Sequence, residues 1–116
     1  MADKVIGEDF LSADDILAVV DIEYATVKAW GKTARLQSLT AGEMIEFREA
    51  NEGEAKRTAG LRLIINSLVD KAGNRILNNT HIAMLRLKSE KQNNAIIKEI
   101  LKLNGLNVDE KATKND

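Results

Sequence analysis

The sequence contains no cysteine and no proline, and each absence narrows what the chain can be. Without cysteine it has no disulfide, no thiolate nucleophile and no sulfur-ligated zinc site, which also fits a reducing compartment. Without proline its helices can run without kinks. Aromatic residues make up only 3% of the 116 residues. The core must therefore be built from Leu, Ile, Val and Ala, through many small contacts rather than a few large anchors.

Long hydrophobic runs are also missing. The best candidate, residues 61–69, is interrupted by Arg62 and Asn66, whereas a membrane span needs about 20 apolar residues. The first nine residues are acidic and lack a hydrophobic segment, so we expect no signal peptide. The length suits one domain. These observations predict a small, soluble protein of the cytoplasm with one modest core and no membrane contact.

The residues that usually carry chemistry do not form a recognisable site. His81 is the only histidine, and a role at the surface or in capping a helix is favoured over catalysis. Asp14 and Asp15 are adjacent, so on a helix they point to different faces. The segment Gly31-Lys32-Thr33 matches the end of a phosphate-binding loop but lacks the upstream glycine, where Thr26 stands. We therefore expect no enzyme activity, no cofactor and no metal.

Charge is divided unevenly along the chain. Residues 1–25 hold one lysine and seven acids, whereas residues 55–102 hold ten basic residues and three acids. The acidic arm could fold onto the basic half, the two halves could present different faces to partners, or the clustering could be an ordinary solvated surface. The basic half contains no aromatic residue for base stacking, and the overall pI is about 5.9. Both features make nucleic-acid binding a minor alternative.

The first third of the chain predicts an arm, a short helix and a hairpin. Residues 1–11 show no sustained period and predict a flexible acidic arm. Ser12, followed by two acids, is typical of a helix start, and we expect a short helix through residue 20. Residues 24–39 favour strands, with a turn at Gly31, so we predict a β-hairpin. Because an isolated hairpin is only marginally stable, it should pack on helices or pair with another chain.

The remainder of the chain predicts helices. Thr40 and Glu43 form a capping box that begins one, and a second is expected over residues 55–69. After a turn at residues 70–74, a short helix is expected over residues 80–88. A second capping box, Ser89 to Gln92, begins a long helix that stops at Gly105, with Leu106 touching Leu101.

The predicted fold class is mainly α, with about four helices packed in one small domain and a short β-hairpin near residues 24–39. The domain is expected to cover residues 12–106. Residues 107–116 are expected to form a disordered polar tail.

Taken in order, several motifs resemble the tail assembly chaperone family of long-tailed bacteriophages. The similarity spans about residues 24–106, although the proline that often precedes the Trp-Gly pair is absent. Its pieces are Val27-Lys28-Ala29-Trp30-Gly31, the strand around Arg35-Leu36, Leu39-Thr40-Ala41-Gly42-Glu43, an arginine-bearing apolar helix leading to Leu68-Val69-Asp70-Lys71-Ala72-Gly73-Asn74, and Leu103-Asn104-Gly105-Leu106.

The resemblance implies a non-catalytic protein of the host bacterial cytoplasm. Members of the family bind the tape measure protein and keep it soluble during tail assembly, and they are absent from the mature virion. Many are also made in a longer, frameshifted form, and the resemblance implies that such a form would recruit the tail tube protein. A homo-oligomer is a further expectation, because an unpaired hairpin edge could support self-association.

Four residues are predicted to form or border the client-binding surface. Trp30, Leu36, Met44 and Phe47 are chosen because they lie in the hairpin and the helix that follows it. Trp30 could equally be the core anchor of the hairpin or a binding hot spot. Two other classes of function remain open: a small helical nucleic-acid-binding regulator, and a virion protein of the head–tail connector type.

Overall fold

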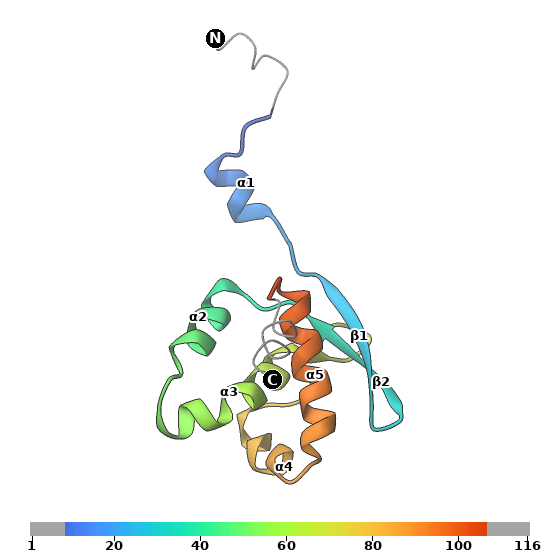
Figure 1. Cartoon of the computed structure of the whole chain (residues 1–116). Coiled ribbons are helices and arrows are strands. Elements are labelled where there is room, and N and C mark those ends of the chain that lie inside the picture. The colour runs from blue at the N-terminus through green and yellow to red at the C-terminus, as the bar shows by residue number, and fades with distance from the viewer. Residues whose placement is uncertain (1–8, 107–116) are drawn as a thin grey trace.

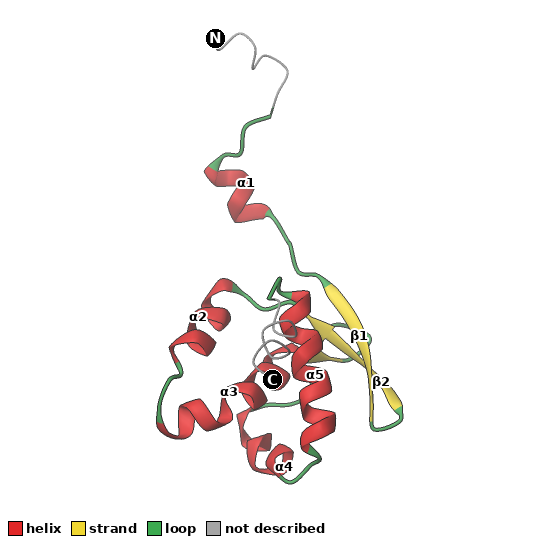
Figure 2. Cartoon of the chain, in the orientation of Figure 1, coloured by secondary structure: helices red, strands yellow, loops and turns green. Residues whose placement is uncertain are grey.

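The computed structural model describes residues 9–106, and it is mainly helical, as the sequence predicts. Figures 1 and 2 show a small body of helices beside a twisted sheet. The helices are α1 (Ala13–Ala18), α2 (Ala41–Glu49), α3 (Gly53–Ser67), α4 (Ile82–Arg86) and α5 (Glu90–Leu103), with a short 3-10 turn, η2 (Asn79–His81), before α4. The strands are β1 (Tyr24–Ala29), β2 (Lys32–Gln37) and β3 (Leu68–Val69).

The core lies where α3, α5 and the sheet meet. Helix α5 packs on β1 and on α3, and α2 and α4 also contact α3 (Figure 1). The buried side chains are almost all aliphatic, as the shortage of aromatic residues requires. They include Ala29, Leu36, Leu63, Ile64, Ile65, Leu85, Ile96, Ile100 and Leu101.

The predicted hairpin is confirmed. Strands β1 and β2 pair antiparallel, from Tyr24 opposite Gln37 to Ala29 opposite Lys32. Trp30 and Gly31 form the two-residue turn, and both have positive φ, at 51° and 77°. This is the backbone geometry of the turns that match the right-handed twist of a hairpin. Glycine adopts it without strain, whereas tryptophan does not.

The prediction of a helix through residue 69 is wrong at its end. Helix α3 stops at Ser67, and Leu68–Val69 becomes strand β3, which pairs antiparallel with Leu36 and Arg35 of β2. The Ser67 hydroxyl also donates a hydrogen bond to the carbonyl of Gln37. These partners are about thirty residues away in sequence. A third strand therefore could not be predicted from local periodicity, and the sheet has three strands rather than two.

Three predicted helix ends can be compared with the structure. Thr40 and Glu43 form the complete capping box at α2. At α5, Ser89 accepts from the Gln92 N–H, but the Gln92 side chain binds elsewhere, so that box is only half formed. The C-terminal end of α5 is the predicted Schellman stop. There Gly105 has a φ of 82°, and the Leu106 N–H donates to the Leu101 carbonyl at 2.8 Å.

Helix α1 begins where predicted, with a capping box between Ser12 and Asp15, but it ends at Ala18 rather than at residue 20. None of its residues is buried, and Figure 1 shows it standing away from the body on an extended segment. Of the arm predicted for residues 1–11, residues 1–8 lie outside the described residues, and so does the whole of the tail predicted for residues 107–116.

Candidate partner-binding surface

The structure places the four predicted client-binding residues in different environments. Leu36 is fully buried beneath the sheet, and the side chain of Met44 is 7% exposed, so both belong to the interior of the body. Phe47 is partly buried and packs against the core from α2. Trp30 is 47% exposed, at the turn of the hairpin. The four side chains therefore do not share one exposed patch, and their role in binding a partner stays a prediction.

Trp30 is held at the turn in a backbone conformation that side chains with a Cβ seldom adopt. Its φ of 51° lies in the left-handed region, which costs a residue of this kind about 1–2 kcal/mol. The Trp30 N–H donates to Gln92 Oε1 at 2.9 Å, which ties the turn to the start of α5. A bulky residue at a position suited to Asn or Gly, with about half of its surface exposed, points to a role outside the fold.

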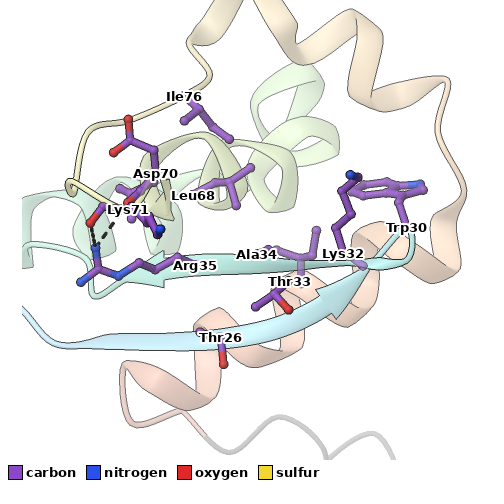
Figure 3. A pocket seen from close by; sticks show the side chains of 13 residues that line it. Thr26, Trp30, Lys32, Thr33, Ala34, Arg35, Leu68, Asp70, Lys71 and Ile76 are labelled. Atoms are coloured by element: carbon purple, nitrogen blue, oxygen red, sulfur yellow. Dashed lines mark hydrogen bonds between the residues drawn. The ribbon is translucent and has the colours of Figure 1, made fainter.

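Trp30 lies beside an apolar groove, which we call the Trp30 groove. It consists of two adjoining hollows of about 700 and 320 Å³ that share Trp30 and Leu68. Figure 3 shows the larger hollow between β2 and the segment that follows α3, with Trp30 at one end and Arg35 at the other. Its apolar lining includes Trp30, Ala34, Leu68, Ile76, Leu77 and Met84.

Basic side chains border the Trp30 groove. Lys32, Lys71 and Lys88 line the two hollows, and within residues 9–106 no ion pair is recorded for any of them. Asp70 is the acidic residue of the lining, but its Oδ1 accepts from the N–H groups of Ala72 and Asn74, both at 2.9 Å. Because that carboxylate is directed into the turn, the groove is apolar with a positive edge.

Arg35 fixes the wall of the groove. Its Nη1 donates to the carbonyl oxygens of Lys71 at 2.7 Å and Asp70 at 3.3 Å, and its guanidinium stacks 3.9 Å from the ring centroid of Tyr24. These contacts hold the 70–74 turn against the sheet, as Figure 3 shows for Arg35 and Lys71. The groove is therefore a built feature of the fold, closed at this end by a charge-assisted contact.

Phe47 borders a different hollow, of about 340 Å³, between α2 and α3. Much of its lining is polar, with Glu43, Glu46, Glu49, Arg62 and Asn66 among its residues. With five polar or charged residues in its lining, this hollow is less suited than the Trp30 groove to the burial of an apolar partner. The hollow beside Phe47 has no lining residue in common with the Trp30 groove.

Sequence reasoning missed most of the Trp30 groove. Leu68 was assigned to a helix, and Met84 to a short helix without a role in binding. In the structure Ile76 is 49% and Met84 39% exposed. The one signal in the sequence was Trp30 itself, because residues that converge from a hairpin, a turn and a short helix share no local period.

Other candidate chemistry is accounted for by local structure. His81 Nδ1 accepts from the Asn78 N–H at 2.9 Å, the capping role predicted for it. Much of the arginine charge in the basic half is paired: Arg57 and Arg86 with Glu54, and Arg75 with Glu43. Across residues 9–106 there is no cluster of acids and histidine fit to hold a metal ion, and no helix has the length and apolarity of a membrane span.

The fold described here is that of a phage tail assembly chaperone. In three dimensions the chain is similar to the tail assembly chaperone of bacteriophage HK97, with a TM-score of 0.56 over 91% of this chain and 96% of that one. The sequences are 14% identical over this match, so the likeness is one of fold. It confirms the resemblance seen in the ordered motifs of the sequence. No protein-family model matches the sequence, and no curated protein matches it.

Proposed function

We propose that the chain is a tail assembly chaperone that binds the tape measure protein of its phage and keeps it soluble until the tail tube forms around it. The observation that supports this function is the shared fold, which extends over nearly the whole of both chains. The proposal includes action in the host cytoplasm and absence from the finished virion.

The Trp30 groove is the client-binding surface within this proposal. A long helical client presents an apolar stripe, and such a stripe is commonly recognised by an apolar groove that admits side chains at helical spacing. The volume of the larger hollow, about 700 Å³, falls within the range of about 300–1,000 Å³ that is typical of pockets that bury most of a ligand's surface. Trp30 supplies the large, half-exposed aromatic surface typical of binding hot spots.

Co-expression with the tape measure protein of the same phage tests the proposal. We expect that protein to be insoluble alone, and to be soluble and to co-purify with the chain when both are made. Replacing the indole should remove most of this effect, and Trp30→Asn suits the test because Asn tolerates the left-handed turn. The variant should reduce the soluble complex by at least about tenfold, since a hot-spot side chain contributes about 2 kcal/mol or more.

Ile45→Gln provides the matched control. Ile45 is also 47% exposed, but it lies on α2 and lines none of the hollows that Trp30 borders. Its replacement should leave the yield of soluble complex unchanged. If the wild-type chain and the tape measure protein do not associate, the chaperone function is wrong. If they associate and W30N binds as well as wild type, only the assignment of the groove is wrong.

A further inference from the structure

A polar hollow of about 590 Å³ lies between α3, the end of α4 and the start of α5. We call it the arginine hollow. The polar residues of its lining that bear on binding are Arg57, Arg86, Lys88, Glu90 and Asn93. The arginine hollow adjoins the Trp30 groove, because Lys88 lines both. An apolar surface that begins at Trp30 is therefore followed by a basic one.

The two arginines of this hollow are held in place by one carboxylate. Glu54 contacts Arg57 Nη2 through Oε1 at 3.0 Å and Arg86 Nη1 through Oε2 at 2.8 Å. One carboxylate between two guanidinium groups leaves a positive charge uncompensated, and Lys88 forms no ion pair within the described residues. Even with Glu90 included, the cluster has a net charge of +1. The arginine hollow therefore suits an anionic group.

Asn93 adds a second requirement, for a hydrogen-bond donor. Its side chain is buried, at 6% exposure, and its Nδ2 donates to the Leu85 carbonyl at 3.0 Å, which ties α5 to α4. Its Oδ1 accepts no hydrogen bond, and across residues 9–106 no other buried side-chain nitrogen or oxygen lacks a partner. Because an unpaired buried acceptor is unfavourable, the lining of the arginine hollow is incomplete without a ligand that carries a donor.

These two requirements select the chemistry of the ligand. A phosphate dianion, free or in a nucleic-acid backbone, offers acceptors alone, so it satisfies the basic side chains but not Asn93 Oδ1. The first turn of an α-helix offers both groups, since its backbone N–H groups have no partner within the helix and acidic side chains are favoured there. An acidic helix start therefore fits the arginine hollow better than phosphate does.

The Trp30 groove provides the surface for the remainder of such a helix. Its lining is apolar, and it meets the arginine hollow at Lys88. At the opposite end of the groove the charged groups are already engaged, because Arg35 donates to the carbonyl oxygens of Asp70 and Lys71, and the Asp70 carboxylate accepts from the turn. The two ends of the surface therefore differ, and a bound helix has one preferred direction.

We propose that the chain binds a helical segment of its partner in one direction, with an acidic first turn in the arginine hollow and the apolar stripe that follows it in the Trp30 groove. The inference rests on the proposed function for the identity of that partner. It adds the chemistry of the segment and the residues that select its direction, Arg86 and Lys88. These side chains are specificity determinants, and Trp30 is the apolar anchor.

Two synthetic helical peptides of the same composition test the direction. Both carry leucines at helical spacing; one has Asp and Glu in its first turn, and the other has them in its last turn. Titrated against the full-length chain, the first should bind at least about fivefold more tightly, as expected for charge pairs at a partly exposed site. This preference should decrease with added salt.

Variants of the chain assign the preference to the arginine hollow. Arg86→Gln combined with Lys88→Gln should remove it, apart from the difference in helicity between the free peptides. Trp30→Asn should weaken both peptides by a similar factor and keep the preference. Lys56→Gln is the matched control, because Lys56 is exposed on α3 and lines neither the groove nor the arginine hollow. It should bind both peptides as wild type does.

Several results would overturn the inference. They are equal binding of the two peptides, tighter binding of the second, binding of neither, or a preference that persists when Arg86 and Lys88 are both replaced. Displacement of the first peptide by inorganic phosphate or a single-stranded oligonucleotide at similar concentrations would show a phosphate site instead. Because neither peptide derives from a tape measure protein, a failure of that protein to associate would refute the proposed function and leave the peptide result unaffected.

Discussion

Trp30 occupies a residue position at which binding and stability make opposite demands. A two-residue turn with positive φ favours Asn followed by Gly, and this chain has Trp followed by Gly. The left-handed conformation costs about 1–2 kcal/mol for a residue with a side chain. The hydrogen bond from the Trp30 N–H to Gln92 offsets part of this cost. The W30N variant should therefore be at least as stable as wild type, although it lacks the indole that lines the Trp30 groove.

Ser67 is a second residue whose role depends on its surroundings. It is fully buried, and its hydroxyl donates to the Gln37 carbonyl at the point where α3 ends and β3 begins. Ser67→Ala leaves that carbonyl without this donor, and a buried polar group left unpaired costs about 1–3 kcal/mol. For a domain of this size we expect a fall in Tm of at least about 4 °C, measured by thermal unfolding.

Ser12→Ala is the control for this substitution. It makes the same chemical change at the cap of α1, which has no buried residue. Its Tm should equal that of wild type, because the loss of a cap on an unpacked helix does not affect the core. Equal Tm values for S67A and wild type would contradict the role given to the Ser67 hydroxyl.

At the scale of the elements, one carboxylate joins two helices. Glu54, in the first turn of α3, contacts Arg57 of the same helix at 3.0 Å and Arg86 of α4 at 2.8 Å. The hydrogen bond from Arg57, together with the positive charge of Arg86, lowers the pKa of Glu54 below its ordinary value of 4.5. Because this pKa is lower in the folded state, the ionised carboxylate stabilises the fold at pH values above 4.5. This contribution to the free energy of unfolding is lost as the pH falls and the carboxylate becomes protonated.

Glu54→Gln tests this link between α3 and α4. At pH 7 the variant should be slightly less stable than wild type, by a small amount because the group is solvent-exposed. The difference in Tm should shrink as the pH is lowered through 4.5 and below, since the wild-type carboxylate then becomes protonated. Thermal unfolding over this pH range measures it. A difference that stays constant with pH would show that the charge of Glu54 does not contribute.

The described part of the chain consists of a body and an arm, residues 9–23, in which every residue is exposed. The buried residues all lie between Ala29 and Leu101, and α1 contributes none. At this scale the uneven charge of the sequence has a structural counterpart. The acidic residues between positions 9 and 23 stand away from the body (Figure 1), while the body carries the lysines that border the Trp30 groove.

Deletion of residues 1–22 should leave the body folded. Because no side chain of α1 is buried, we expect cooperative unfolding with a Tm within about 2 °C of wild type at a protein concentration low enough to prevent assembly. Deletion of residues 1–29 is the comparison. It removes β1, which packs on α5, and should abolish cooperative unfolding. Loss of cooperativity in the shorter deletion would contradict the division into arm and body.

Local signals in the sequence predicted most of the elements. The capping box at Thr40, the Schellman stop at Gly105 and the turn at Gly31 each depend on residues within a few positions of one another. Strand β3 was not predicted, because its two residues are extended only through pairing with β2. The side chain of Gln92 was assigned to a cap for the same reason, since its partner at Trp30 is distant in sequence.

The sequence by itself determined the class of fold, the hairpin with its tryptophan turn, and the separation of acidic from basic residues. Only the tertiary structure decided which apolar side chains remain exposed. It buried Leu36 and Met44, left Trp30 half-exposed, and brought Leu68, Ile76 and Met84 together beside it. The physical reason is that helix caps and turns form from neighbouring residues, whereas a groove forms where separate elements meet, and no local pattern records that meeting.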